Sequence, residues 1–203
     1  MKLKSSCIPP DRAENICHVA SELFARYGFE EVSMRHIAEE CGVTMATVYY
    51  HFESKEELQV EVAQLKFDEF MNAASRMWAA LAESRRRPSS MMALVFDYVL
   101  ADPTFFLLLQ HDLHRFDAGP RHVRSRRQTA LILSLIKKSV AAHVSPQDAE
   151  TDALLLGGLL AGTCELVLAD ARSSGPDAET FVARHRDALI RHVDRAFPAA
   201  SPK

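Results

Sequence analysis

The chain has 203 residues, of which 48% are hydrophobic and 25% are charged, a composition typical of folded globular proteins that excludes wholesale disorder and fibrous folds. Seven glycines and nine prolines are too few for an all-β chain with a turn about every ten residues. A net charge of −3 excludes a global basic field for nucleic acid or an acidic membrane, so any contact with DNA must come from a local arrangement of residues.

The first predicted helix runs from Asp11 to Tyr27. Asp11 can cap its start together with Glu14, and apolar residues recur from Ile16 to Tyr27 on one helical face. Gly28 follows directly and suits the left-handed backbone that ends many helices. The sequence therefore predicts an amphipathic helix whose apolar face includes Tyr27.

Three further helix starts lie close together after this helix. Ser33 can cap a second helix, Gly42 supplies a tight turn, and Thr44 can cap a third helix that ends near Phe52. A capping box at Ser54 opens a fourth helix. Three helices in about fifty residues, two of them joined by a short turn that contains glycine, form the layout of a helix-turn-helix.

Beyond residue 58 the pattern changes to long helices without strand-like alternation. Prolines at positions 88, 103, 120, 146 and 176 mark the boundaries, because proline is tolerated at the start of a helix but not inside it. About five more helices result. We expect an all-α fold with a three-helix N-terminal domain over residues 1–55 and a larger helical domain over residues 56–203.

The third helix is the most informative segment. Val48 and Phe52 are spaced by four and can both face the core. Because successive residues are rotated by about 100° around a helix, the neighbouring Tyr49, Tyr50 and His51 cannot all be buried. Their hydroxyl and imidazole groups suit phosphate oxygens, and their rings suit sugars and thymine methyl groups. The alternative is a solvated three-helix bundle in which these aromatic side chains have no function.

Four segments of this region carry a specific likeness: FARYGF at 24–29, MRHIA at 34–38, CGV at 41–43 and TVYYHFESKEEL at 47–58. From Asp11 to Leu58 the chain resembles, without a gap, the DNA-binding domain of TetR-family bacterial transcriptional regulators. The resemblance implies an all-helical homodimer, usually a repressor, whose paired recognition helices read a palindromic operator in double-stranded DNA. It also implies that the C-terminal domain dimerises and binds a small molecule that releases the DNA.

Carried over position by position, the resemblance implies a recognition surface and two contacts to the DNA backbone. The recognition residues are Thr44, Met45, Ala46, Thr47, Tyr49, Tyr50 and His51, and the backbone contacts are Arg35 and Lys55. Many members of the family have a basic residue in place of Met45 and glycine in place of Ala46, so the operator sequence is not predicted. Residues 1–55 contain six basic and eight acidic residues, and we therefore expect weak nonspecific binding with a modest salt dependence.

Residues 151–171 contain two rows of small residues spaced by four. Each glycine inside a helix costs about 1 kcal/mol relative to alanine, so a close approach of another helix should compensate. That helix belongs either to the same chain or to a second copy, and the family resemblance favours a dimer seam completed by the last helix. The predicted interface residues are Ala153, Gly157, Gly158, Ala161, Gly162, Phe181, Leu189, Ile190, Val193 and Phe197.

The middle helices carry aromatic and methionine side chains that indicate either plain core or a ligand pocket. The candidate lining residues are Phe67, Met71, Trp78, Phe96, Phe105, Phe106, Leu109 and Phe116, with His111, His114, Cys164 and Glu165 as polar groups. A pocket of this kind predicts a small, largely apolar effector with one or two polar groups. Two histidines spaced by three without a third strong ligand nearby favour surface residues, so we expect no metal and no other cofactor.

Other classes of protein receive little support. No G-x-S-x-G, glycine-rich phosphate loop, H-E-x-x-H or paired carboxylate motif is present, so we do not expect an enzyme. A helical protein-interaction module without DNA binding is the alternative hypothesis. The N-terminus lacks an apolar signal segment, and the longest uncharged apolar stretch, residues 153–164, is too short to span a bilayer. Scattered thiols without a C-x-x-C pair favour a cytoplasmic protein with reduced cysteines at Cys7, Cys17, Cys41 and Cys164.

Overall fold

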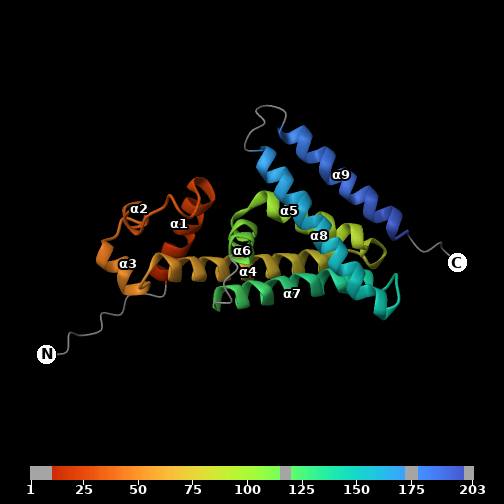
Figure 1. The fold of residues 1–203 in the computed structure, drawn as a ribbon, viewed down its shortest axis with the longest axis horizontal. Helices are drawn as coiled ribbons and strands as arrows, with labels where there is room; N and C mark the ends of the chain where they lie inside the picture. The colour runs from red at the N-terminus through yellow and green to blue at the C-terminus, as the bar shows by residue number, and fades with distance from the viewer. Residues whose placement is uncertain (1–10, 115–119, 172–177, 199–203) are drawn as a thin grey trace. The chain divides into compact units, whose positions relative to one another are not determined.

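The computed structural model of the chain describes residues 11–114, 120–171 and 178–198. All regular structure in these ranges is helical, which confirms the predicted all-α fold (Figure 1). The helices are α1 (Asp11–Tyr27), α2 (Met34–Glu40), α3 (Met45–His51), α4 (Lys55–Ala80), the 3-10 helix η1 (Glu83–Arg85), α5 (Pro88–Ala101), α6 (Thr104–His114), α7 (Pro120–Val140), α8 (Pro146–Ala171) and α9 (Ala178–Ala196). As predicted, α5, α7 and α8 begin at prolines.

The chain divides into two compact units. Unit 1 comprises residues 1–68 and 104–111, and unit 2 comprises residues 69–103 and 112–203. The domain boundary expected at residue 55 coincides with the start of α4, and the first half of that helix still belongs to unit 1. Helix α4 therefore contributes to both units, and so does α6.

Unit 1 is built around one apolar core shared by its helices. Ile16 and Phe24 of α1, Ile37 of α2, Val48 of α3 and Leu58 of α4 are almost fully buried in it. A seven-residue helix such as α2 or α3 is too short to be stable alone in water. Burial of a large apolar side chain contributes about 1.5–3 kcal/mol, so the common core holds the short helices in place.

Unit 2 has α5 at its centre, because α5 packs against α7, α8 and α9. The side chains of Met91, Met92 and Phe96 on α5 are buried, as are those of Ile136 on α7 and Val193 on α9. Helix α8 also packs against α7 and α9. The apolar residues predicted to lie within long helices thus form a second core.

Helix α8 contains residues 153–164, the uncharged apolar stretch expected to be too short for a bilayer. By length and composition alone, its segment Pro146–Asp170 is sufficient to cross a membrane, although little of it is buried within the chain. Among the described residues, α5 and α6 together pass the same test only as a pair bent by 96°. Helix α8 therefore has exposed apolar residues, such as Leu154, Leu155 and Leu166, that the core of its own chain does not cover.

Candidate nucleic-acid interface

Hydrogen bonds define both ends of α2, and those at its C-terminal end form the turn into α3. Ser33 caps α2, and its Oγ accepts a hydrogen bond from the backbone N–H of His36 at 3.1 Å. At the other end of α2, Gly42 adopts a φ of +64°, which a side chain would disfavour. Its N–H donates to Glu39 O, and the next N–H, of Val43, donates to Ala38 O. This C-terminal motif fixes the direction in which the chain enters α3.

Helix α3 has one buried face and one exposed face. Thr44 caps it, with its Oγ1 accepting from the backbone N–H of Thr47 at 3.2 Å. Val48 is fully buried, and Phe52, directly after the helix, is nearly so. Val43 is partly buried against the same core. The arrangement predicted from the i, i+4 spacing is therefore the one observed.

The other side of α3 carries the predicted recognition residues. Tyr49 is 49% exposed and Tyr50 is 64% exposed, whereas His51 is half-buried. The rings of Tyr50 and His51 meet edge to face, with centroids 5.1 Å apart. Thr44, Met45 and Ala46 are exposed and Thr47 is half-buried. No acidic side chain lies on α3, so this face does not repel phosphate through a charge of its own.

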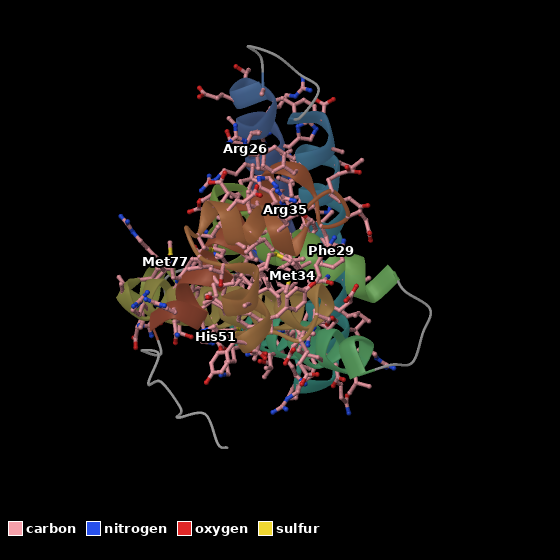
Figure 2. The ribbon with its side chains drawn as sticks, turned by 90° about the vertical axis from the view of Figure 1, so that its left-hand side faces the viewer. Arg26, Phe29, Met34, Arg35, His51 and Met77 are labelled. Carbon is pink, nitrogen blue, oxygen red and sulfur yellow. The ribbon has the colours of Figure 1, made fainter. Side chains whose placement is uncertain are left out.

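One ring nitrogen of His51 is buried. Its Nε2 is inaccessible to solvent and has no hydrogen-bond partner in the described part of the chain. A buried polar atom without a partner costs free energy, and because this Nε2 is inaccessible, the His51 ring would have to turn before Nε2 could contact a ligand. In Figure 2, which is turned so that α2 and α3 face the viewer, His51 and Arg35 are labelled.

The two predicted backbone contacts differ in their surroundings. Arg35 is highly exposed, and its Nε donates to Glu39 Oε1 at 2.8 Å. The hydrogen bond and the charge of Glu39 raise the pKa of Arg35. Lys55 instead donates from Nζ to the backbone oxygen of Glu30 at 3.1 Å and lies 4.3 Å from the centroid of the Phe29 ring. Lys55 therefore ties the loop after α1 to the start of α4.

Tyr27 differs from the expectation drawn from the α1 pattern. Its spacing groups it with the apolar face of α1, yet its side chain is exposed, since it is the last residue of the helix. Its ring lies 5.2 Å from the guanidinium of Arg26 and 5.5 Å from the His36 ring of α2. Sequence reasoning missed this aromatic and basic group, although the adjacent arginine and tyrosine were a signal for it.

The structure separates the two rows of small residues on α8. A Cβ atom added to Gly157 would lie 2.5 Å from Leu133 Cδ2 of α7, and Ala153 in the same row is buried. A Cβ added to Gly158 or Gly162 would meet nothing within 4 Å. The first row therefore takes part in a crossing within the chain, and the second row is open.

The predicted interface residues of α9, and Phe197 directly after it, also have contacts within the chain. Leu189, Val193 and Phe197 are buried, whereas Ile190 is half-buried. Phe181 is half-buried as well, and its ring centroid lies 4.0 Å from that of His185. In α8, Ala161 is half-buried. The side chains of α9 thus contribute mainly to the core of unit 2.

The predicted pocket residues do not all fall in one unit. Phe67, Phe105, Phe106 and Leu109 are buried in unit 1, where the rings of Phe67 and Phe105 lie 5.5 Å apart. In unit 2, Phe96 and Cys164 are buried, Met71 and Trp78 are half-buried, and Glu165 is exposed. Phe116 and the side chains of His111 and His114 lie outside the described residues. Within the described residues no three potential metal ligands lie close enough to hold an ion.

The all-helical fold and the exposed α3 face of a capped helix-turn-helix define the class of helix-turn-helix DNA-binding regulators. Residues 16–62 match the family model of bacterial regulatory proteins of the tetR family. This N-terminal segment therefore has the sequence of a tetR-family DNA-binding domain.

Similar proteins include transcriptional regulators from other bacteria. The chain is 27% identical over 99 residues to the transcriptional activator FasR of Mycolicibacterium smegmatis, covering 49% of this chain and 45% of FasR. It is 23% identical over 110 residues to the transcriptional repressor KstR2 of Rhodococcus jostii, covering 54% of each chain. The match spans about half the length of these curated relatives. A solved transcriptional regulator from Saccharomonospora viridis, in complex with choline, has the same fold with a TM-score of 0.73 and 19% identity, over 92% of this chain and 97% of that one.

Proposed function

We propose that the protein is a homodimeric, ligand-responsive transcriptional repressor that binds a palindromic operator through α3. The observation that carries the proposal is the exposure of Tyr49 and Tyr50 on a helix whose opposite face is fully buried. Two large aromatic side chains in water contribute nothing to the core. Their hydroxyl groups can donate to phosphate oxygens, and their rings can contact sugars and bases.

The surroundings of α3 support direct contact with DNA. The residues at its start, Thr44 to Thr47, are small or flexible and allow this end to enter a major groove. Arg35 keeps an exposed guanidinium with further donors beside its bond to Glu39. Lys55 acts in this proposal through position, because it holds the loop between α1 and α2, and its remaining donors can reach a phosphate.

The experiment is selection of bound fragments from genomic DNA of the host by the purified full-length chain at two salt concentrations. A recovered palindrome is then titrated against Tyr49→Ala and Tyr50→Ala, and against Val123→Ala, an exposed residue of α7, as the control. Loss of one hydrogen bond to a charged phosphate should weaken binding about tenfold or more. The unfolding free energy should change little, because both tyrosines are exposed.

No enrichment at low salt from a folded dimeric sample would contradict the proposal. The α3 surface would then be assigned to a protein partner, as in the alternative hypothesis of an interaction module. Equal binding by the tyrosine variants and the Val123→Ala control would also contradict it.

The homodimer is proposed to form through the open side of α8. Leu154, Leu155 and Leu166 are 61%, 65% and 70% exposed, and they lie on the same side as Gly158 and Gly162. Their positions repeat at helical spacing, which makes a continuous apolar stripe. A partner helix can approach closely where glycine has no side chain. Covering this stripe with a second copy would also explain a helix so apolar and so little buried within its own chain.

Release of DNA by a small molecule is proposed for unit 2. The neighbour from Saccharomonospora viridis was solved with choline, which supports a small-molecule effector for this fold. Half-buried Trp78 and Met71 remain the proposed lining within this unit. Repression is preferred over activation from the family resemblance, and a protein that reads chromosomal operators is expected in the cytoplasm. In this proposal residues 1–55 bind DNA, and residues 56–203 bind the effector and form the dimer.

A further inference from the structure

Helix α3 carries no side chain of the types that make paired hydrogen bonds to one purine base. Its seven residues, Met45–His51, include no arginine, lysine, asparagine or glutamine. In the major groove, arginine or lysine recognises guanine through O6 and N7, and asparagine or glutamine recognises adenine through N6 and N7. The contacts that most often recognise guanine and adenine are therefore absent from this helix.

The remaining polar groups of α3 and its cap offer few hydrogen bonds to bases. Thr44 Oγ1 accepts from the Thr47 N–H at 3.2 Å, and the two threonine hydroxyls share a further hydrogen bond at 2.9 Å. One of their two hydroxyl protons is therefore already used. The Nε2 atom of His51 is inaccessible to solvent. Tyr49 and Tyr50 are exposed, and in the proposed function their hydroxyl groups donate to phosphates.

The residues around the start of α3 instead present methyl groups to solvent. Met45 is 37% exposed, and Thr44 and Ala46 are exposed as well. These three uncharged side chains carry the methyl group on Sδ of Met45, the Cγ2 methyl group of Thr44 and the Cβ methyl group of Ala46, and together we call them the methyl surface. In helix-turn-helix proteins the first residues of the recognition helix contact the edges of the bases. The methyl surface is therefore the part of α3 that meets the bases.

Thymine is the base that such a surface can recognise. Among the four bases of DNA it alone carries a methyl group, on C5, in the major groove, and apolar side chains recognise this group by direct contact. A contact of this kind needs no hydrogen-bond donor. Met45 has the longest side chain of the methyl surface, and its flexible thioether adapts to the shape of the partner.

We propose that the methyl surface of α3 recognises thymine through its C5 methyl group, with Met45 as the residue that determines this specificity. Each half-site of the operator then contains a thymine where Met45 meets the bases. The proposal rests on the proposed function, because it needs α3 to enter the major groove. It adds the chemical feature of the DNA that is recognised there.

The test replaces thymine by deoxyuridine, which pairs with adenine in the same way but lacks the C5 methyl group. The DNA is the palindrome recovered by the genomic selection, with one thymine at a time replaced symmetrically in both half-sites. Binding by the full-length chain is measured by fluorescence anisotropy at one fixed salt concentration. Burial of one methyl group corresponds to about fourfold in affinity, so the symmetric replacement at the contacted position should weaken binding about fifteenfold. Cytosine at this position should also weaken binding, and 5-methylcytosine should restore part of the loss.

Two methionine variants assign the effect to one side chain. Met45→Ala should bind the thymine operator more weakly and lose most of the difference between thymine and deoxyuridine at the contacted position. Met77, a methionine of α4 that is 49% exposed, provides the matched control, and Met77→Ala should keep both the affinity and the difference. Neither variant should change the melting temperature much, because both side chains are exposed. An effect of deoxyuridine on DNA shape would be equal in all three proteins.

Three results would overturn the proposal. The first is equal binding of the thymine and deoxyuridine operators at every position. The second is a Met45→Ala variant that keeps the full difference between the two bases. The third is a half-site without thymine on either strand. In each case the repressor assignment still stands if Tyr49→Ala and Tyr50→Ala weaken binding, whereas no enrichment of any fragment would refute both proposals.

Discussion

Replacing the glycines of α8 one at a time by alanine distinguishes packing within the chain from packing between two copies. Gly157 faces α7, where a new methyl group would lie 2.5 Å from Leu133 Cδ2, about 1–1.5 Å inside normal carbon contact of about 3.5–4.0 Å. Leu133 would have to change rotamer, and overpacking of this kind costs about 1–3 kcal/mol. The better helix propensity of alanine returns about 1 kcal/mol. We expect Gly157→Ala to be neutral or destabilising by up to about 2 kcal/mol.

Gly158 and Gly162 should behave in the opposite way within one chain. An added methyl group meets nothing within 4 Å at either position, so each substitution should stabilise the folded chain by up to about 1 kcal/mol. If a second copy packs against this side, the same methyl groups push the partner helix away. The prediction is a chain that is more resistant to urea at high dilution but dimerises more weakly.

The assay combines urea titrations with analytical ultracentrifugation across a range of protomer concentrations. Gly157→Ala serves as the internal comparison, because its methyl group points into the chain. Stabilisation by Gly157→Ala equal to that by Gly158→Ala would refute the close α7–α8 crossing. An unchanged or tighter dimer in the Gly158→Ala and Gly162→Ala variants would refute the proposed close seam on this side of α8.

Further predictions concern a cap, an ion pair and the cysteines. Thr44→Ala should lower the unfolding free energy in urea by about 1 kcal/mol, because the first turn of α3 loses its capping acceptor. Arg186→Ala should cost less than about 1 kcal/mol, since its pair with Asp97 is partly exposed, and a double-mutant cycle with Asp97→Ala measures the coupling. Burial raises the pKa of both Cys17 and Cys164 from 9.0 to about 12. Between these values the unfolded chain loses thiol protons that the folded chain keeps, so stability should fall as pH rises from 9 towards 12. Alanine at both cysteines should flatten this fall in urea titrations, and an unchanged slope would contradict the burial effect.

The local structure of unit 1 was predictable because it depends on neighbouring residues. Ser33 and Thr44 cap their helices, and Gly28 and Gly42 adopt positive φ as their positions after α1 and α2 predict. Each of these features is decided within one turn of backbone, where hydrogen-bonding capacity and the absence of a Cβ atom determine the conformation. The exposure of the α3 tyrosines follows from the same logic once the side bearing Val48 is assigned to the core.

The predictions that depended on distant residues were less complete. Tyr27 fits the apolar spacing of α1 but lies at its last turn, where the core no longer covers that face. Spacing also cannot say which row of glycines faces the same chain, because both rows repeat every four residues. A hollow in unit 2 that Met77, Leu94 and Ile190 line is formed by segments up to more than a hundred residues apart, so spacing along the chain could not predict it.

The composition of α8 is best explained by packing on two sides. Its buried residues, such as Leu156, Leu160 and Val167, already form one apolar side against the chain's own core. The opposite side adds exposed leucines, so the whole helix reaches the apolar content of a membrane span. However, Asp152 and Glu165 lie within it, and ionised carboxylates are costly in the hydrocarbon of a bilayer. At the edge of a protein interface they can stay hydrated. A helix apolar on both sides yet carrying such charges fits a position between two protein cores, and therefore the proposed homodimer.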